Sequence, residues 1–105
     1  MKLQITTVPG SNAIRLAGDL DIYSADSARQ TLLDHLTDKV GIELDLAGIE
    51  TCDAAGMQLL LAARRSALAA GKTLALRAPV PVIEKCGEAL GLGPENRLPY
   101  ATPNL

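Results

Sequence analysis

The chain has 105 residues, of which 48% are hydrophobic and 21% are charged, a composition that fits one globular domain with a single core and argues against disorder. The formal net charge of -2 gives no basic field for a phosphate backbone, and the absence of Phe and Trp leaves little for stacking on bases. Nucleic-acid binding is therefore not expected, and the core must be aliphatic.

The first part of the chain predicts a hairpin followed by a helix. One strand begins within residues 3–8 and a second runs over 13–17, and the short turn between them predicts antiparallel pairing. Residues 18–21 are then expected to leave the sheet. Ser24 is predicted to cap a helix that ends near Lys39. The residues at helical spacing that would face the sheet are Ala25, Ala28, Leu32 and Leu36.

The middle of the chain predicts a strand, a polar turn and a second helix. Apolar residues alternate with acidic ones over 42–46, the period of a strand with one buried face. The leucine-rich run after Met57 has no β-branched residue and predicts a helix closed by Gly71. Asp53 stands where an N-cap belongs. Glycine is a poor helix former, so its presence at position 56, in the first helical turn, indicates that another group needs close access to the backbone there.

The last part of the chain predicts one more strand and one more helix. The strand covers residues 73–77, and Pro81 suits the first turn of a helix in which Ile83, Cys86 and Leu90 share a face. Residues 97–105 are expected to form a short edge strand or a loosely ordered tail. This order predicts an α/β fold with a mixed sheet of four to five strands and three to four helices mainly on one face, as one domain over residues 1–105.

The middle segment resembles the signature of the STAS domain, the family of bacterial anti-sigma factor antagonists and related regulatory modules. The resemblance rests on Leu-Asp-Leu-Ala-Gly-Ile from Leu44, which leads to Asp-Ala-Ala-Gly-Met from Asp53 and then to a leucine-rich helix. It extends over nearly the whole chain through the order of elements, and it implies a STAS-like fold. In the antagonists the residue directly after the turn Asp is usually a serine that a partner kinase phosphorylates. Here that residue is Ala54.

The resemblance implies a non-catalytic module of partner-switching signal transduction that acts in transcription regulation. Its expected partner is a protein, an anti-sigma factor or a serine kinase of the ATPase-fold type. The expected partner-binding residues are Asp21, Tyr23, Ser24, Asp53, Ala54, Ala55, Gly56 and Met57. Since Ala54 has no hydroxyl, either the domain stays permanently competent to bind, which we favour, or another hydroxyl such as Thr51 or Ser24 takes the phosphate.

The sequence predicts no catalytic, cofactor or metal site. The single histidine, His35, is expected on the exposed side of the first helix, away from any nucleophile. Three carboxylates, Asp19, Asp21 and Asp53, could gather at one end of the sheet, although capping and turn formation are simpler explanations for Asp19 and Asp53. We therefore expect a protein that is not an enzyme.

The two cysteines are too few for a disulfide framework and are not spaced as metal ligands. We interpret Cys52 and Cys86 as buried, reduced thiols that behave as small hydrophobes. The N-terminus shows no signal-peptide pattern and the apolar runs are too short to span a bilayer. These features predict a cytoplasmic protein without direct membrane insertion.

Two alternatives to the antagonist function remain. The first is a small STAS subunit of a lipid-transport ATPase complex, since family members also stabilise nucleotide-binding subunits of that kind. The second is a nucleotide-binding protein that uses the acidic turns. Co-purification distinguishes them, because each predicts a different bound molecule.

Overall fold

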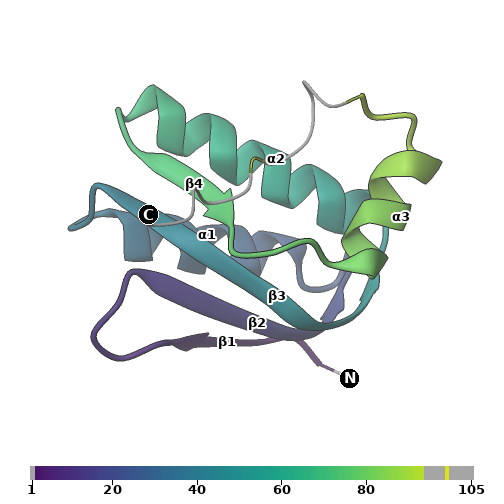
Figure 1. Ribbon diagram of the computed structural model, residues 1–105, viewed down its shortest axis with the longest axis horizontal. Coiled ribbons are helices and arrows are strands. Elements are labelled where there is room, and N and C mark those ends of the chain that lie inside the picture. The colour runs from purple at the N-terminus through teal and green to yellow at the C-terminus, as the bar shows by residue number, and fades with distance from the viewer. Residues whose placement is uncertain (1, 94–98, 100–105) are drawn as a thin grey trace.

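The computed structural model describes residues 2–93 and 99, which form one mixed sheet covered by helices (Figure 1). The elements are β1 (Gln4–Thr7), β2 (Ala13–Leu20), α1 (Ala25–Leu36), β3 (Gly41–Cys52), α2 (Ala54–Ala69), β4 (Thr73–Leu76) and α3 (Pro81–Ala89). The strand order is β1-β2-β3-β4, with β1 antiparallel to β2 and the other neighbours parallel. The predicted hairpin and mixed α/β sheet are confirmed. Among the described residues, no helix is long and apolar enough to cross a membrane.

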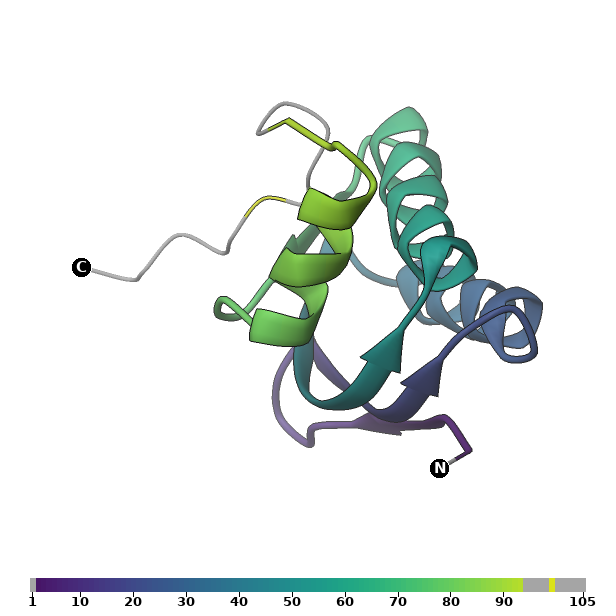
Figure 2. The ribbon, with the colours of Figure 1, turned by 90° about the vertical axis from the view of Figure 1, so that its right-hand side faces the viewer.

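Two helices lie side by side on one face of the sheet, and the third lies apart from them. The helices α1 and α2 pack against each other and against β2 and β3 (Figure 1). Helix α3 lies beside the last part of β3, close to the point where α2 begins (Figure 2). The carboxyl ends of β2 and β3 therefore meet the amino-terminal ends of α1 and α2 at one end of the domain.

The core between the sheet and the helices is aliphatic, as the composition predicts. The largest fully buried side chains are Ile14, Leu16, Leu20, Leu32, Leu44, Leu46, Leu60 and Leu74. Each such side chain contributes about 1.5–3 kcal/mol when it leaves water. No polar or charged residue is buried in the part of the chain that the structure describes. The fold is thus held by hydrophobic contact between the strands and the inner stripes of the helices.

Both central strands are longer than the sequence predicts. Strand β2 continues to Leu20 instead of leaving the sheet at residue 18, and β3 continues to Cys52 instead of ending at residue 46. The pairing of β2 with β3 shifts register twice, each time with one extra residue on β3. These bulges leave Ala47 and Gly48 both exposed before Ile49 turns inward. Because the alternation of buried and exposed residues is interrupted there, the sequence of the second half of β3 resembles that of a turn.

Helix α1 begins where predicted, but it differs from its prediction in its capping hydrogen bond, its C-terminal end and one face. It ends at Leu36, three residues before the predicted end, with Thr37 as C-cap. Its N-cap residue is Ser24, but that side chain makes no capping hydrogen bond. His35 is half-buried rather than exposed. Its Nδ1 lies 2.7 Å from the carbonyl oxygen of Thr31, one turn earlier in the same helix. This contact lies within one helix and does not involve a nucleophile.

The buried faces of α2 and α3 are also narrower than predicted. Leu68, near the end of α2, is 50% exposed, because Ala67 faces the sheet and successive helical residues point about 100° apart. Leu90 is 40% exposed because it follows the end of α3, and Gly87 takes its place on the buried face. The predicted edge strand or tail at residues 97–105 lies outside the described residues except at Pro99, whose carbonyl oxygen accepts from the Leu76 N–H at 2.8 Å.

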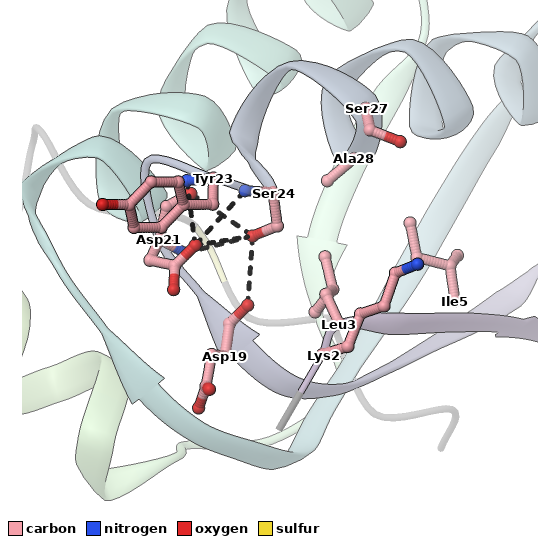
Figure 3. Close-up of a pocket in the computed structure, with 9 residues that line it drawn as sticks. All are labelled: Lys2, Leu3, Ile5, Asp19, Asp21, Tyr23, Ser24, Ser27 and Ala28. Atoms are coloured by element: carbon pink, nitrogen blue, oxygen red, sulfur yellow. Dashed lines mark hydrogen bonds between the residues drawn. The ribbon is translucent and has the colours of Figure 1, made fainter.

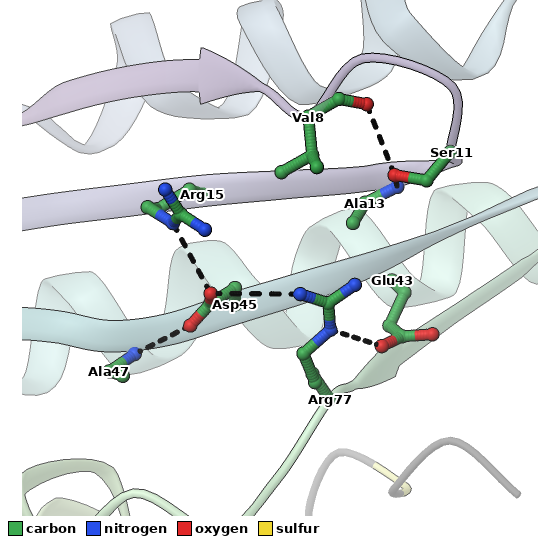
Figure 4. Close-up of polar contacts among 8 residues, drawn as sticks. All are labelled: Val8, Ser11, Ala13, Arg15, Glu43, Asp45, Ala47 and Arg77. Carbon is green, nitrogen blue, oxygen red and sulfur yellow. Dashed lines mark hydrogen bonds and ion pairs between the residues drawn. The ribbon is translucent and has the colours of Figure 1, made fainter. Parts of the chain in front are cut away.

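The face of the sheet opposite α1 and α2 carries a row of ion pairs (Figure 4). The Arg15 Nε lies 3.3 Å from Asp45 Oδ2, and the Arg77 Nε lies 2.7 Å from Glu43 Oε1. Arg77 also reaches Asp45, with its Nη1 3.9 Å from Oδ2. Since the two arginine side chains are about half exposed, solvent screens these pairs and each contributes little to stability. The charges on this face are therefore largely matched to one another.

Candidate partner-binding site

Two loops join at the end of the sheet where β2 and β3 finish. The backbone N–H of Asp53 donates to the carbonyl oxygen of Leu20 at 3.2 Å, and the N–H of Ile22 donates to Asp53 Oδ2 at 3.4 Å. Asp19, Asp21 and Asp53 all lie at this end of the sheet, where the sequence indicates that they could gather. The loop before α1 and the start of α2 consequently form one connected surface.

Asp53 starts α2 as a capping residue, which confirms the prediction made from its position. Its Oδ1 accepts from the N–H of Gly56 at 2.9 Å, and its carbonyl oxygen accepts from the N–H of Met57 at 3.0 Å. Its other carboxylate oxygen accepts from the loop at Ile22. One side chain therefore satisfies a free helical N–H and also ties the neighbouring loop to the helix.

We expect Asp53→Ala to lower the free energy of unfolding by about 1–2 kcal/mol, since both backbone donors lose their acceptor. Urea denaturation monitored by circular dichroism measures this change. Asp53→Asn is the matched control, because an amide oxygen still accepts at the cap, and it should lose less. Equal stability of Asp53→Ala and the wild type would contradict the role assigned to this side chain.

Gly56 provides close access to the backbone, but the segment that uses this access belongs to the same molecule. A Cβ at Gly56 would lie 2.1 Å from the carbonyl oxygen of Leu20, so only glycine lets α2 approach β2 this closely. The neighbouring Met57 is 4% exposed and belongs to the core. This placement corrects the prediction that Gly56 and Met57 contact a partner directly, because neither presents a side chain at the surface.

The loop before α1 is held by its own side chains (Figure 3). Asp21 Oδ1 accepts from the N–H groups of Tyr23 and Ser24, at 3.0 and 3.2 Å. The Ser24 hydroxyl donates to the carbonyl oxygen of Asp19 at 3.0 Å, so it points back into the loop instead of capping α1. Asp21 therefore builds an Asx turn, and this turn leaves the Tyr23 side chain outside.

Exposed residues from the two loops and from the first turns of α2 make a continuous surface. We define the α2-entrance patch as Ile22, Tyr23, Asp53, Ala54, Ala55 and Gln58. Tyr23 is 94% exposed and Ile22 is 68% exposed, high values for large apolar side chains. Among these residues Ala55 is half-buried and the others are exposed. Ile22 and Gln58 are additions to the predicted set; Gln58 lies four residues after Ala54, a spacing that the helical period could have found.

A cavity of about 380 Å³ lies beside the patch (Figure 3). It has apolar residues from β1 and α1 on one side and the polar loop that follows β2 on the other. The residues that line it are Lys2, Leu3, Ile5, Asp19, Asp21, Tyr23, Ser24, Ser27 and Ala28. The surface at this end of the molecule is thus hollowed next to the exposed side chain of Tyr23.

The hydroxyls near the start of α2 are already engaged. Thr51 Oγ1 donates to Asp19 Oδ1 at 2.9 Å, across the last pairs of β2 and β3. The Ser24 hydroxyl is half-buried in its loop. Ala54, in contrast, has only a methyl group at the surface. The position that follows the turn Asp is therefore accessible but has no atom to which phosphate could be attached.

A family model described as "Mlab, STAS domain" matches residues 3–98. An anti-sigma factor antagonist from Mycobacterium paratuberculosis superposes with a TM-score of 0.70 at 19% identity, over 96% of this chain and 86% of that one. A comparison with curated proteins gives no match.

A second similar protein has been solved in two forms. The anti-sigma factor antagonist SpoIIAA in its unphosphorylated form has a TM-score of 0.68 at 24% identity, over 96% of this chain and 89% of that one. The Bacillus cell fate determinant SpoIIAA in its phosphorylated form has a TM-score of 0.63 at 22% identity, over 96% and 92%. At these identities the likeness establishes a shared fold.

Proposed function

The chain belongs to the STAS domain family, and from this premise we propose that it is a non-catalytic protein-binding module of the anti-sigma factor antagonist type. Its α2-entrance patch contacts a regulatory protein, of which the best candidate is an anti-sigma factor or a serine kinase of the ATPase-fold type. The observation that carries this proposal is the exposure of Ala54 and Tyr23 on one rigid surface at the start of α2.

The physical properties of the patch support protein binding. An exposed aromatic side chain loses little conformational entropy on binding and removes a large apolar area from water, so tyrosine is frequent among residues that dominate binding energy. The exposed Ile22 adds apolar area beside Tyr23. Because Asp53 and Asp21 hold the loop through hydrogen bonds, the partner need not order it first.

The lack of a hydroxyl at Ala54 decides the form of partner switching that we propose. The similar antagonist SpoIIAA exists in unphosphorylated and phosphorylated forms. By the family resemblance, the phosphorylated residue is the one that follows the turn Asp, here Ala54. Without an acceptor at that position, the module stays competent to bind, and its partner or its own abundance controls the complex.

Incubation with ATP and the serine kinase that co-purifies with the domain should leave residues 51–56 of the wild type without phosphate, as measured by mass spectrometry. Ala54→Ser restores an exposed hydroxyl next to Asp53 and should become phosphorylated under the same conditions. Stoichiometric phosphate on wild-type Thr51 would contradict permanent binding competence and would make Thr51 the substitute acceptor.

A second candidate function is that of a small STAS subunit in a lipid-transport ATPase complex. Ala54 favours it too, since a permanent subunit of an assembly needs no phosphate switch at its contact surface. Affinity purification of the wild type distinguishes the two. A kinase or anti-sigma factor supports the first function, an ATPase subunit supports the second, and nucleotide bound to the isolated chain would contradict both in favour of a nucleotide-binding protein.

A further inference from the structure

The two cysteines, far apart in sequence, both contact one backbone carbonyl. The Sγ atoms of Cys52 and Cys86 lie 3.6 and 3.5 Å from the carbonyl oxygen of Asp53, so both thiols donate to the same acceptor. Both residues are half-buried and neither is in a disulfide. The prediction of reduced thiols is confirmed, but the two residues are half-buried rather than buried. Cys52 is the last residue of β3, next to the cap of α2, and Cys86 lies in α3, so the two thiols form a dithiol where these three elements meet.

The surroundings of the dithiol set its reactivity. Burial, together with the neighbouring Cys86 thiol, raises the pKa of Cys52 to about 12. Because the thiolate is the attacking species, Cys52 reacts slowly near neutral pH, and the first attack on an external disulfide falls to Cys86.

We propose that Cys52 and Cys86 form a reversible redox site that closes by exchange with a low-molecular-weight disulfide such as oxidised glutathione. Cys86 thiolate attacks one sulfur of the small disulfide, a mixed disulfide forms, and one glutathione thiolate leaves and takes up a proton. Cys52, after losing its proton to solvent, attacks the Cys86 sulfur and releases the second glutathione. Two protein thiols are oxidised, and one small disulfide is reduced to two thiols.

A disulfide between Cys52 and Cys86 has a defined structural consequence. It closes a loop that contains residues 53–85, that is, α2, β4 and the start of α3. Closing a loop of this size restricts the unfolded chain and stabilises the folded one. Since Cys52 directly precedes the cap of α2, oxidation fastens α3 to the base of the α2-entrance patch. The redox site itself does not depend on the proposed function of the patch.

Equilibration of the full chain in glutathione buffers of rising oxidised fraction, followed by acid quenching and mass spectrometry, tests the site. We expect a monomer that loses two hydrogen atoms in mass, with a peptide map that links Cys52 to Cys86. The oxidised form should unfold about 10 °C above the reduced form. Cys52→Ser should stop at a glutathione adduct on Cys86, which a reductant removes.

Three results would overturn the proposal. These are two free thiols at the most oxidising ratio, a wild-type protein that accumulates only glutathione adducts, and a disulfide-linked dimer on non-reducing gels. The mass measurement on the wild type needs no variant, so poor folding of a serine variant would not prevent a decision. Circular dichroism of each variant confirms that its fold is intact before its thiols are compared.

Discussion

Gly56→Ala should destabilise the domain by about 3 kcal/mol, although alanine is the better helix former by about 1 kcal/mol. The new Cβ would lie 2.1 Å from the carbonyl oxygen of Leu20 and 2.8 Å from its carbonyl carbon. The obstructing atoms belong to the backbone of a central strand, so relief requires that α2 move away from β2. Urea denaturation of the purified variant measures the loss.

Gly10→Ala provides the matched control for this substitution. A Cβ at Gly10 meets no atom within 4 Å, and the only strain comes from its φ of +75°. Its expected cost is about 1–2 kcal/mol. A Gly56→Ala variant that is as stable as Gly10→Ala would mean that α2 does not depend on close approach to β2, and the account of how the patch is positioned would be wrong.

Ala54→Asp should weaken binding of the protein partner by about 2 kcal/mol, or about 30-fold, while the domain stays folded. The new carboxylate would lie beside Asp53 in the middle of the patch, where a partner must remove water from both charges. The fold should tolerate the change, since a negative charge at the start of a helix interacts favourably with the helix dipole. Isothermal titration calorimetry with the co-purified partner measures the affinity.

Thr6→Asp is the charge control for this experiment. Thr6 is exposed on β1 and pairs with Arg15, so an added carboxylate there is favourably placed and is not part of the α2-entrance patch. It should leave the affinity unchanged. Equal weakening by both variants would point to a general charge effect, and unchanged affinity of Ala54→Asp would remove the start of α2 from the binding surface.

The parts of this molecule that could be predicted from sequence are those with a local physical signal. The Asp53 cap, the glycine that ends α2 and the hairpin turn each depend on residues within a few positions of one another. The alternation in the first half of β3 required only that one face of the strand be buried. Such signals predict the fold because they need no knowledge of distant residues.

The features that sequence did not predict depend on contacts between distant segments. The bulges of β3 exist only relative to β2, so the inward turn of Ile49 could not be found from β3 alone. The pairing of Cys52 with Cys86 required the position of α3. The burial of Gly56 against Leu20 likewise decides which predicted contact residues remain at the surface, and no local pattern reveals it.

Docking of the partner on the α2-entrance patch can be followed residue by residue, by chemical-shift mapping of the isotope-labelled domain titrated with its partner. We expect the largest perturbations at Ile22, Tyr23, Ala54 and Gln58, with little change along the ion-paired face at Arg15 and Arg77. Perturbations confined to that charged face, with the start of α2 unchanged, would contradict docking on the α2-entrance patch.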